Sequence, residues 1–318
     1  MKVSVVVPLF NKRETVKRSL ASIAAQTFGD FEVVVVDDGS TDGGDAIASG
    51  FPDPRFRVIR QANAGPGSAR NRGVAESRGE LVAFLDADDE WLPQYLETGV
   101  ELLAGEPSRA AVACAWCDEP GGQTAPWLHR KLLPGLFRAT AETPPELLLY
   151  TLILFSPCST IARREVVQRY GGFYSRGCRY GEDAHLWLKV LLNEPVWVNL
   201  APLVKFHRGA SSLSGNLHQM RPVEPFLTDP DDIRRMCPAA LRLLLDQFLC
   251  MRALKTSALL CLWGRREEAA RLRKRFLVAD SWRFPWYFTS WVGTVRPFSM
   301  AFTVAAAVWR RTRLRGRA

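Results

Sequence analysis

Short runs of apolar, β-branched residues alternate with segments of helical periodicity through the first hundred residues, and this alternation limits the fold more than any other feature. The apolar runs predict four strands, at Val3–Val7, Glu32–Val36, Arg55–Ile59 and Leu81–Leu85. The segments between them predict helices over Lys12–Ala25, Asp42–Ser49 and Ser68–Ser77. Strands joined through helices form a largely parallel sheet that is covered on both faces. The sequence therefore predicts an α/β fold that binds ligands beyond the carboxyl ends of its strands.

The pattern changes in the second half of the 318-residue chain. Further strands are predicted at Cys158–Ala162 and Val196–Phe206, with the helix Ala184–Leu192 between them. Beyond them the spacing indicates only helices, Pro238–Leu262 and Arg265–Phe276. We therefore expect an α/β domain over residues 1–215 and a basic helical segment over residues 216–318. The Gly- and Pro-rich stretch over residues 120–145 is expected to form an irregular excursion over the site.

The net charge of +9 is unevenly distributed along the chain. From Pro238 onward there are 16 Lys and Arg residues against 4 Asp and Glu residues, whereas the rest of the chain carries a net charge of −3. A nucleic-acid-binding domain would be expected to carry a basic patch on its main fold. The α/β part has none, so we expect no nucleic-acid partner.

Seven cysteines are scattered along the chain without an extracellular pairing pattern. The chain also runs directly from Met1 into its first predicted strand, which leaves no room for an export signal. Both observations favour reduced thiols and a cytoplasmic location.

Acidic residues follow two of the predicted strands directly. Asp37 and Asp38 come after one strand, and the run Asp86-Ala87-Asp88-Asp89 comes after another. Asp is also an ordinary turn former and helix cap, which is the alternative explanation for either loop alone. A pair of carboxylates at a strand end suits Mg²⁺ or Mn²⁺ held against a diphosphate. Asp86 and Asp88 are the candidate ligands.

Two further polar groups lie near strand or helix ends. Glu182 and Asp183 precede a helix, where either could act as a general base or simply favour the positive end of the helix dipole. His207 and Arg208 follow the last predicted strand. There a histidine could bind the metal and an arginine could pair with phosphate, or both could belong to a solvated loop.

The order of these motifs resembles glycosyltransferase family 2, whose members have the GT-A fold, a Rossmann-like mixed sheet with helices on both faces. The resemblance covers about residues 2–212. It rests on Ser4–Lys12, Ala24–Phe28, Val35–Asp42, Asn63–Gly65, Ala69–Gly73, Phe84–Asp89, Gly171–Phe173, Gly181–Asp183 and Trp187.

The resemblance implies an inverting transfer of a sugar from a nucleoside-diphosphate sugar, with UDP as the expected nucleotide. It implies that Pro8 and Phe10 line the base pocket and that Asp38, with Asp37, receives a hydrogen bond from the base. The further roles that it implies are donor contacts by Arg70, Asp86 and Arg208, metal binding by Asp86, Asp88 and His207, and catalysis by Asp183 with Glu182 in support. The implied acceptor is a saccharide or lipid-linked hydroxyl in polysaccharide or glycolipid synthesis.

The C-terminal segment suggests contact with a membrane surface. Phe284–Trp309 is apolar apart from Arg296, and five arginines follow it. Arg296, Pro285 and Pro297 interrupt the run and disfavour a membrane span. An aromatic, apolar segment beside a basic end is typical of a helix that lies on an anionic membrane, and packing against protein is the alternative. The sequence thus predicts a location at the inner face of the membrane.

Two other functions remain open at the level of sequence. A nucleotidyltransferase also uses paired aspartates and a metal, but it would be expected to have a Gly-rich basic loop after its first strand, where Pro8–Asn11 stands. A catalytically inactive binding protein of the same fold is the second alternative. Intact Asp86, Asp88 and Asp183 argue against it.

Overall fold

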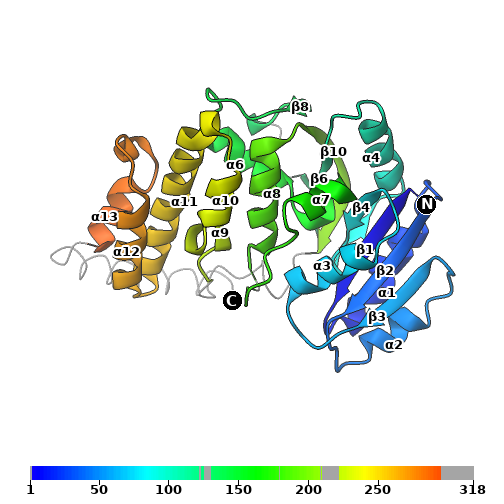
Figure 1. Cartoon of the computed structure of the whole chain (residues 1–318). Coiled ribbons are helices and arrows are strands. Elements are labelled where there is room, and N and C mark those ends of the chain that lie inside the picture. Colours follow the sequence, from blue (N-terminus) through cyan, green and yellow to red (C-terminus); the bar gives the residue numbers. More distant parts are fainter. Residues whose placement is uncertain are drawn as a thin grey trace.

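The computed structural model describes residues 2–121, 123–124, 130–178, 180–207, 209 and 222–294. Within these ranges ten strands form one mixed sheet at one end of the molecule, and helices extend from it toward the other end (Figure 1). Val5, Val6 and Val7 of the first strand are all fully buried. Because successive strand residues point to opposite faces, both faces of the sheet are covered.

The strands have short, largely apolar sequences. Their bounds are β1 Val3–Leu9, β2 Phe31–Asp37, β3 Phe56–Arg60, β4 Leu81–Phe84, β5 Glu90–Trp91, β6 Ala111–Glu119, β7 Gln123–Thr124, β8 Gly135–Phe137, β9 Thr160–Arg163 and β10 Val196–His207. Their order in the sheet is β3-β2-β1-β4-β9-β6-β10-β5, with β7 beside β6 and β8 beside β10.

The helices connect the strands and then continue alone. Their bounds are α1 Arg13–Ala24, α2 Gly44–Ser49, α3 Pro66–Glu76, α4 Tyr95–Ala104, α6 Pro145–Leu154, α7 Arg164–Arg169, α8 Glu182–Asn193, α9 Pro225–Thr228, α10 Asp231–Met236, α11 Arg242–Leu262, α12 Arg266–Phe276 and α13 Tyr287–Thr294. Three 3₁₀ turns complete the described structure, η1 Pro157–Ser159, η2 Ala239–Leu241 and η3 Ser281–Arg283.

Strand directions confirm the α/β prediction and define where the sheet becomes mixed. β1 is parallel to β2 and β4, and β2 is parallel to β3, as the strand–helix alternation predicts. β9 runs antiparallel to both β4 and β6, and β10 is parallel to β6. The carboxyl ends of β1, β2 and β4 therefore lie at one edge of the sheet. The polar loops noted in the sequence come directly after these strand ends.

Two predicted segments differ from the structure. The expected strand Cys158–Ala162 is divided, because Pro157–Ser159 form a 3₁₀ turn with mutual capping by Ser156 and Ser159, and β9 begins only at Thr160. The described part of residues 120–145 contributes β7 and β8 to the sheet. None of its described residues lines the main cavity, so the expectation of an excursion over the site is wrong for them.

Close packing of α3 on β1 determines the position of Arg70, one of the candidate site residues. A methyl group added at Gly73 would lie 2.2 Å from Val6 Cγ1, so only glycine permits this approach. One turn earlier on the same helix stands Arg70. The neighbouring Asn71 side chain accepts a hydrogen bond from Phe173 N at 2.8 Å and donates one to Phe173 O at 2.7 Å. These contacts fix α3 between the sheet and the loop that leads to α8.

The C-terminal helices pack directly against the α/β part. α10 contacts α8, and α11 contacts α6 and α9. Figure 1 shows α11, α12 and α13 on the side of α8 away from β1–β3. A single apolar core includes Val5 of the sheet, Trp187 of α8 and Phe248 of α11. The predicted boundary at residues 215 and 216 lies outside the described residues, and the division into two domains stays a prediction. No helix in the described ranges is long and apolar enough to cross a membrane.

Candidate active site

A cavity of about 650 Å³ opens where the carboxyl ends of β1, β2 and β4 meet the beginning of α8. Most of the site residues predicted from the sequence line it, namely Pro8, Phe10, Asp38, Arg70, Asp86, Asp88, Glu182, Asp183 and His207. Asp37 is fully buried and does not line the cavity. Arg208 lies outside the described residues.

Pro8 and Phe10 form an apolar wall at the end of β1. The Phe10 side chain remains 43% exposed, although it is surrounded by a well-packed sheet edge. The next residue, Asn11, has a φ of 51°, and its side-chain oxygen accepts a hydrogen bond from Thr41 N at 2.9 Å. This turn fixes Phe10 so that its ring is available for stacking with a planar ligand.

Asp38 and Asp37 organise the loops around this wall. Asp38 accepts hydrogen bonds from the backbone amides of Ala64 and Gly65, both at 2.9 Å, and from Gln61 Nε2 at 2.8 Å. Asp37 accepts a hydrogen bond from Ser40 N and lies 3.1 Å from Arg60 Nε. Asp38 thus lines the cavity and orders its rim, whereas Asp37 acts from behind as an anchor of the loop.

Arg70 connects the two sides of the cavity. Its guanidinium lies 2.6 Å from Asp86 Oδ1, after β4, and 2.6 Å from Glu182 Oε1, at the start of α8. Burial by itself lowers the pKa of a guanidinium, but Asp86 and Glu182 outweigh this effect and raise the pKa of Arg70. Arg70 is therefore a permanent cation whose charge is shared by two carboxylates from segments 96 residues apart in sequence.

Asp88 forms an ion pair that the sequence did not suggest. Lys12, just before α1, places Nζ 2.6 Å from Asp88 Oδ2. Burial, and then the charge of Asp86, raises the pKa of Asp88 against the opposing effect of Lys12. A basic residue immediately after the Pro8–Asn11 turn was the available sequence signal for this pair.

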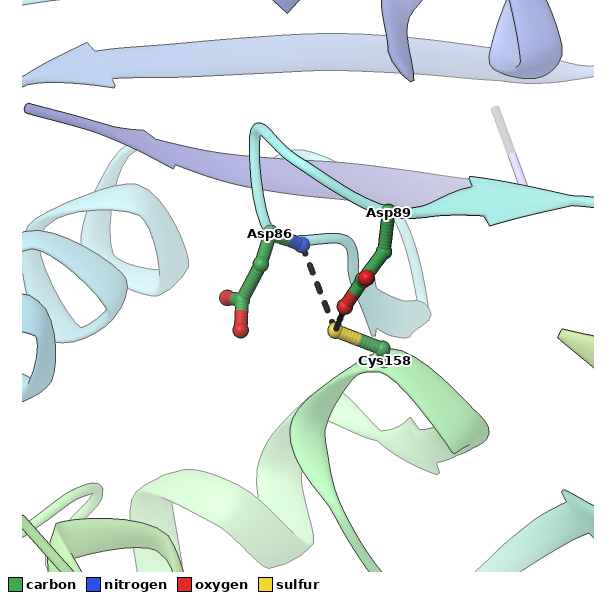
Figure 2. A group of neighbouring side chains, drawn as sticks. All are labelled: Asp86, Asp89 and Cys158. Carbon is green, nitrogen blue, oxygen red and sulfur yellow. Dashed lines mark hydrogen bonds between the residues drawn. The ribbon is translucent and has the colours of Figure 1, made fainter. Parts of the chain in front are cut away.

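Asp86, Asp89 and Cys158 form a close group of potential metal ligands. One potential ligand atom from each lies within 4.8 Å of the others. Figure 2 shows the Cys158 sulfur between the two aspartates, where it accepts a hydrogen bond from Asp86 N at 3.3 Å and donates one to Asp89 Oδ2 at 3.4 Å. Burial raises the pKa of the Cys158 thiol, so it stays protonated. Asp89 was part of the acidic run in the sequence, but Cys158 carried no signal.

The carboxylates of this group fit a divalent cation. Burial, followed by the charges of Asp86 and Asp88, raises the pKa of Asp89 to about 8. Such a shift arises where a carboxylate is buried beside other carboxylates. Hard carboxylate oxygens suit Mg²⁺ or Mn²⁺, whereas a protonated thiol does not. Asp86 and Asp89 are accordingly the carboxylates of this group that could hold a metal, and the role of Asp88 as a metal ligand stays a prediction.

His207 lies beside this group at the end of β10. Its backbone N–H donates to Asp89 Oδ1 at 3.0 Å, and its ring Nε2 lies 2.6 Å from Glu90 Oε1. The imidazole lines the cavity but is not a member of the close ligand group. Its role as a metal ligand stays a prediction.

Glu182 and Asp183 begin α8 but have different surroundings. Glu182 is buried and paired with Arg70. Asp183 is half-buried, and no described side chain forms an ion pair with it. Burial, followed by the charge of Glu182, raises the pKa of Asp183 to about 7, while Arg70 opposes the shift. Asp183 can therefore exchange a proton near neutral pH, as a general base must.

The C-terminal helices contribute cavity residues that sequence analysis missed. Glu224, just before α9, and Arg252, in the middle of α11, both line the cavity and pair with each other. The signal for Arg252 was a cation near the centre of a largely buried helix, with Lys255 three residues further on. Glu224 had no comparable signal.

The family model for Glycosyl transferase family 2 matches residues 4–171, more than half of the sequence, and the chain belongs to this family. The E. coli protein named uncharacterized glycosyltransferase YibD is 37% identical over 126 residues, which cover 39% of this chain and 37% of that protein. The Rhizobium meliloti succinoglycan biosynthesis protein ExoO is 40% identical over 111 residues, 35% of this chain and 32% of that protein. The chain thus spans about a third of the length of the curated relatives it matches.

Solved structures confirm the GT-A fold. S. aureus TarS 1-349 in complex with UDP-GlcNAc superposes with a TM-score of 0.61 at 19% identity, covering 89% of this chain and 90% of that chain. The mannosyltransferase PcManGT from Pyrobaculum calidifontis, in complex with GDP-Man and Mn²⁺, gives a TM-score of 0.57 at 19% identity, covering 96% and 86%. At these identities the similarity establishes the fold alone.

Proposed function

We propose that the chain is an inverting glycosyltransferase that moves a sugar from a UDP-sugar to a hydroxyl group of a saccharide or lipid-linked acceptor. The observation that carries the proposal is the position of Asp183. Its carboxyl group, with a pKa raised to about 7 by burial and by Glu182, lines the same cavity as the acidic group at the end of β4. One cavity thus combines a base with carboxylates that suit a metal–diphosphate ligand.

The residues divide the reaction between two sides of the cavity. Phe10 stacks on the nucleotide base, and Asp38 orders the loop that borders it. Asp183 removes the proton of the acceptor hydroxyl as the acceptor oxygen attacks the anomeric carbon. The bond from that carbon to the diphosphate oxygen breaks, and the nucleoside diphosphate leaves with the electron pair. A divalent cation held by Asp86, Asp88 and Asp89 would neutralise charge on this leaving group.

The relatives and structural neighbours support the choice of substrates. TarS is described with UDP-GlcNAc, and PcManGT with GDP-Man and Mn²⁺. ExoO and ExoW carry names in succinoglycan biosynthesis. We accordingly propose a role in the synthesis of a polysaccharide or glycolipid, with Mn²⁺ or Mg²⁺ as cofactor.

A donor-binding experiment tests this function. Calorimetry with UDP and GDP, each with Mn²⁺ and with a chelator, should give the tightest binding for UDP with Mn²⁺, because the cation offsets repulsion between the diphosphate and the acidic group. Hydrolysis of UDP-sugars should accompany binding. Failure of all nucleoside diphosphates to bind would reject the proposed function, and tighter binding of GDP would change the donor.

We also propose that the C-terminal segment holds the enzyme at the inner face of a membrane. The large aromatic side chains Trp282, Trp286, Phe288 and Trp291 are each more than 40% exposed. Arg283 and the basic last turn of α12 lie next to them in sequence. Deletion of residues 284–318 should release the protein from anionic liposomes, and salt should weaken binding of the full chain. A full chain that ignores such liposomes at low salt would contradict the membrane contact.

A further inference from the structure

We propose that Glu224 and Arg252 form the subsite that binds the acceptor, and that the part of the acceptor held there is a neutral saccharide. This inference rests on the proposed function, since it takes Asp183 as the base. Both residues belong to the C-terminal helices, outside the region matched by the family model. They nevertheless line the same cavity as Asp183.

The pair lies directly against the turn that precedes the base. Gly181, with a φ of +74°, caps α8 ahead of Glu182 and Asp183, and a methyl group added there would lie 3.4 Å from Glu224 Cγ. Glu224 Oε1 pairs with Arg252 Nη2. An acceptor whose hydroxyl group reaches Asp183 therefore has its neighbouring groups beside this pair.

Charge favours a neutral occupant over an anionic one. Seven Asp and Glu side chains line the cavity among the described residues, against three Lys and Arg side chains. Glu224 and Arg252 neutralise each other, so the pair offers no net positive charge to an anion. It does offer a carboxylate that accepts O–H bonds beside a guanidinium that donates N–H bonds, which matches adjacent sugar hydroxyls.

The α6 part of the cavity wall suits the carbon face of a sugar ring. Leu149, Leu152 and Ile153 of α6 line the cavity, and Ile153 is 40% exposed. Ligand sites commonly combine such apolar surface with a few polar groups that fix orientation. The polar pair and the apolar side chains of α6 give the cavity both features.

If the Glu224–Arg252 pair only stabilised the fold, its variants would lower the melting temperature, transfer and hydrolysis together. Arg234 and Asp246 form a more exposed ion pair between α10 and α11, at 3.2 Å, with both side chains more than 40% exposed and neither lining the cavity. Asp246→Asn therefore controls for the loss of an ion pair of the C-terminal helices that lies outside the cavity, and melting temperatures control for the loss of a buried pair. Arg252→Lys keeps the charge of Arg252 but removes the planar donor geometry.

The experiment measures transfer and donor hydrolysis in the same reaction of the full chain. UDP-sugars with Mn²⁺ are offered to methyl glycosides of neutral sugars and, in parallel, of uronic acids. We expect transfer to neutral glycosides. Glu224→Gln and Arg252→Lys should raise the acceptor KM about tenfold or more, because each loses hydrogen bonds to a charged group. Hydrolysis of the donor by water should change less than about twofold in both variants, and Asp246→Asn should behave like wild type.

Each other outcome has a defined meaning. An unchanged acceptor KM in both variants would overturn the subsite, as would a parallel loss of transfer, hydrolysis and melting temperature, which would show a structural clamp. Transfer to uronic acids alone, or to none of the glycosides while the donor is hydrolysed, would overturn the neutral-saccharide assignment. A chain that neither binds nor hydrolyses any UDP-sugar would instead reject the proposed function on which the inference rests.

Discussion

Asp86 and Asp88, on the sheet side of the cavity, form ion pairs, whereas Asp183, on the α8 side, forms none with a described side chain. On the sheet side, Asp88 lies 2.6 Å from Lys12 Nζ, and Asp86 lies 2.6 Å from a guanidinium nitrogen of Arg70. On the helical side, Asp183 has no ion-pair partner among the described side chains, and burial raises its pKa to about 7. The ion pairs hold Asp86 and Asp88 in position, whereas Asp183, half-buried and with its pKa raised, can gain and lose a proton near neutral pH. This contrast agrees with the proposal that the sheet side binds the donor and the α8 side performs proton transfer.

Replacement of Asp183 should have the largest effect, a loss of turnover. Asp183→Asn keeps the shape of the side chain but cannot accept the proton, so turnover should fall by about 10²–10⁴-fold while UDP affinity stays nearly unchanged. Glu182→Gln is the comparison variant and should cost less in rate, because Glu182 is engaged with Arg70. Initial rates and calorimetry check both. Loss of UDP binding equal to the loss of rate would move Asp183 to the donor side of the comparison.

Arg70, which pairs with a carboxylate on each side of the cavity, should contribute to the free energy of unfolding. Arg70→Met leaves Asp86 and Glu182 without their common partner, and breaking a buried pair of this kind costs about 3–5 kcal/mol of unfolding free energy. Arg72→Met on the same helix is the matched control, since the Arg72 side chain is 57% exposed and its pair with Glu76 should contribute less than about 1 kcal/mol. Denaturant unfolding measures both variants. Equal stability losses would show that Arg70 does not hold the two sides together.

The effect of Mn²⁺ on UDP affinity should be smaller than these losses and should depend only on residues of the sheet side. Mn²⁺ should strengthen UDP binding to the wild type, and Asp88→Ala should reduce this enhancement by about tenfold or more, because one of the few hard ligands is lost. Calorimetry with Mn²⁺ and with chelator gives the enhancement for each protein. Asp183→Asn serves as the control and should keep it. If chelator changes no nucleoside-diphosphate affinity in the wild type, the metal assignment is wrong.

Sequence analysis predicted the parallel part of the sheet because its signals are local. Runs such as Val3–Val7 contain their own β-branched pattern, and the acidic residues that follow Leu81–Leu85 lie next to the strand end that positions them. The order of these motifs also supported the GT-A prediction, which the structural comparisons confirm. The strand predicted at Cys158–Ala162 overlaps β9 but begins two residues too early, because Ser156 and Ser159 cap a 3₁₀ turn that apolar periodicity does not detect.

Contacts between distant segments could not be predicted in the same way. Lys12 and Asp88 are 76 residues apart, and Arg70 and Glu182 are 112 residues apart. The pairing of Arg70 with Glu182 depends on how α3 and α8 pack, which for α3 depends on a glycine at position 73. Glu224 had no sequence signal because its position against Gly181 arises only when α9 packs on α8.

The pH dependence of donor turnover tests most directly the claim that Asp183 is the base. Because the base must be deprotonated to act, and burial together with Glu182 raises its pKa to about 7, turnover at saturating donor and Mn²⁺ should rise with pH through about 7 and then level off. Asp183→Asn should remove this rise and leave a low, nearly flat profile. A wild-type profile without an inflection near neutral pH, or the same inflection in Asp183→Asn, would contradict the account.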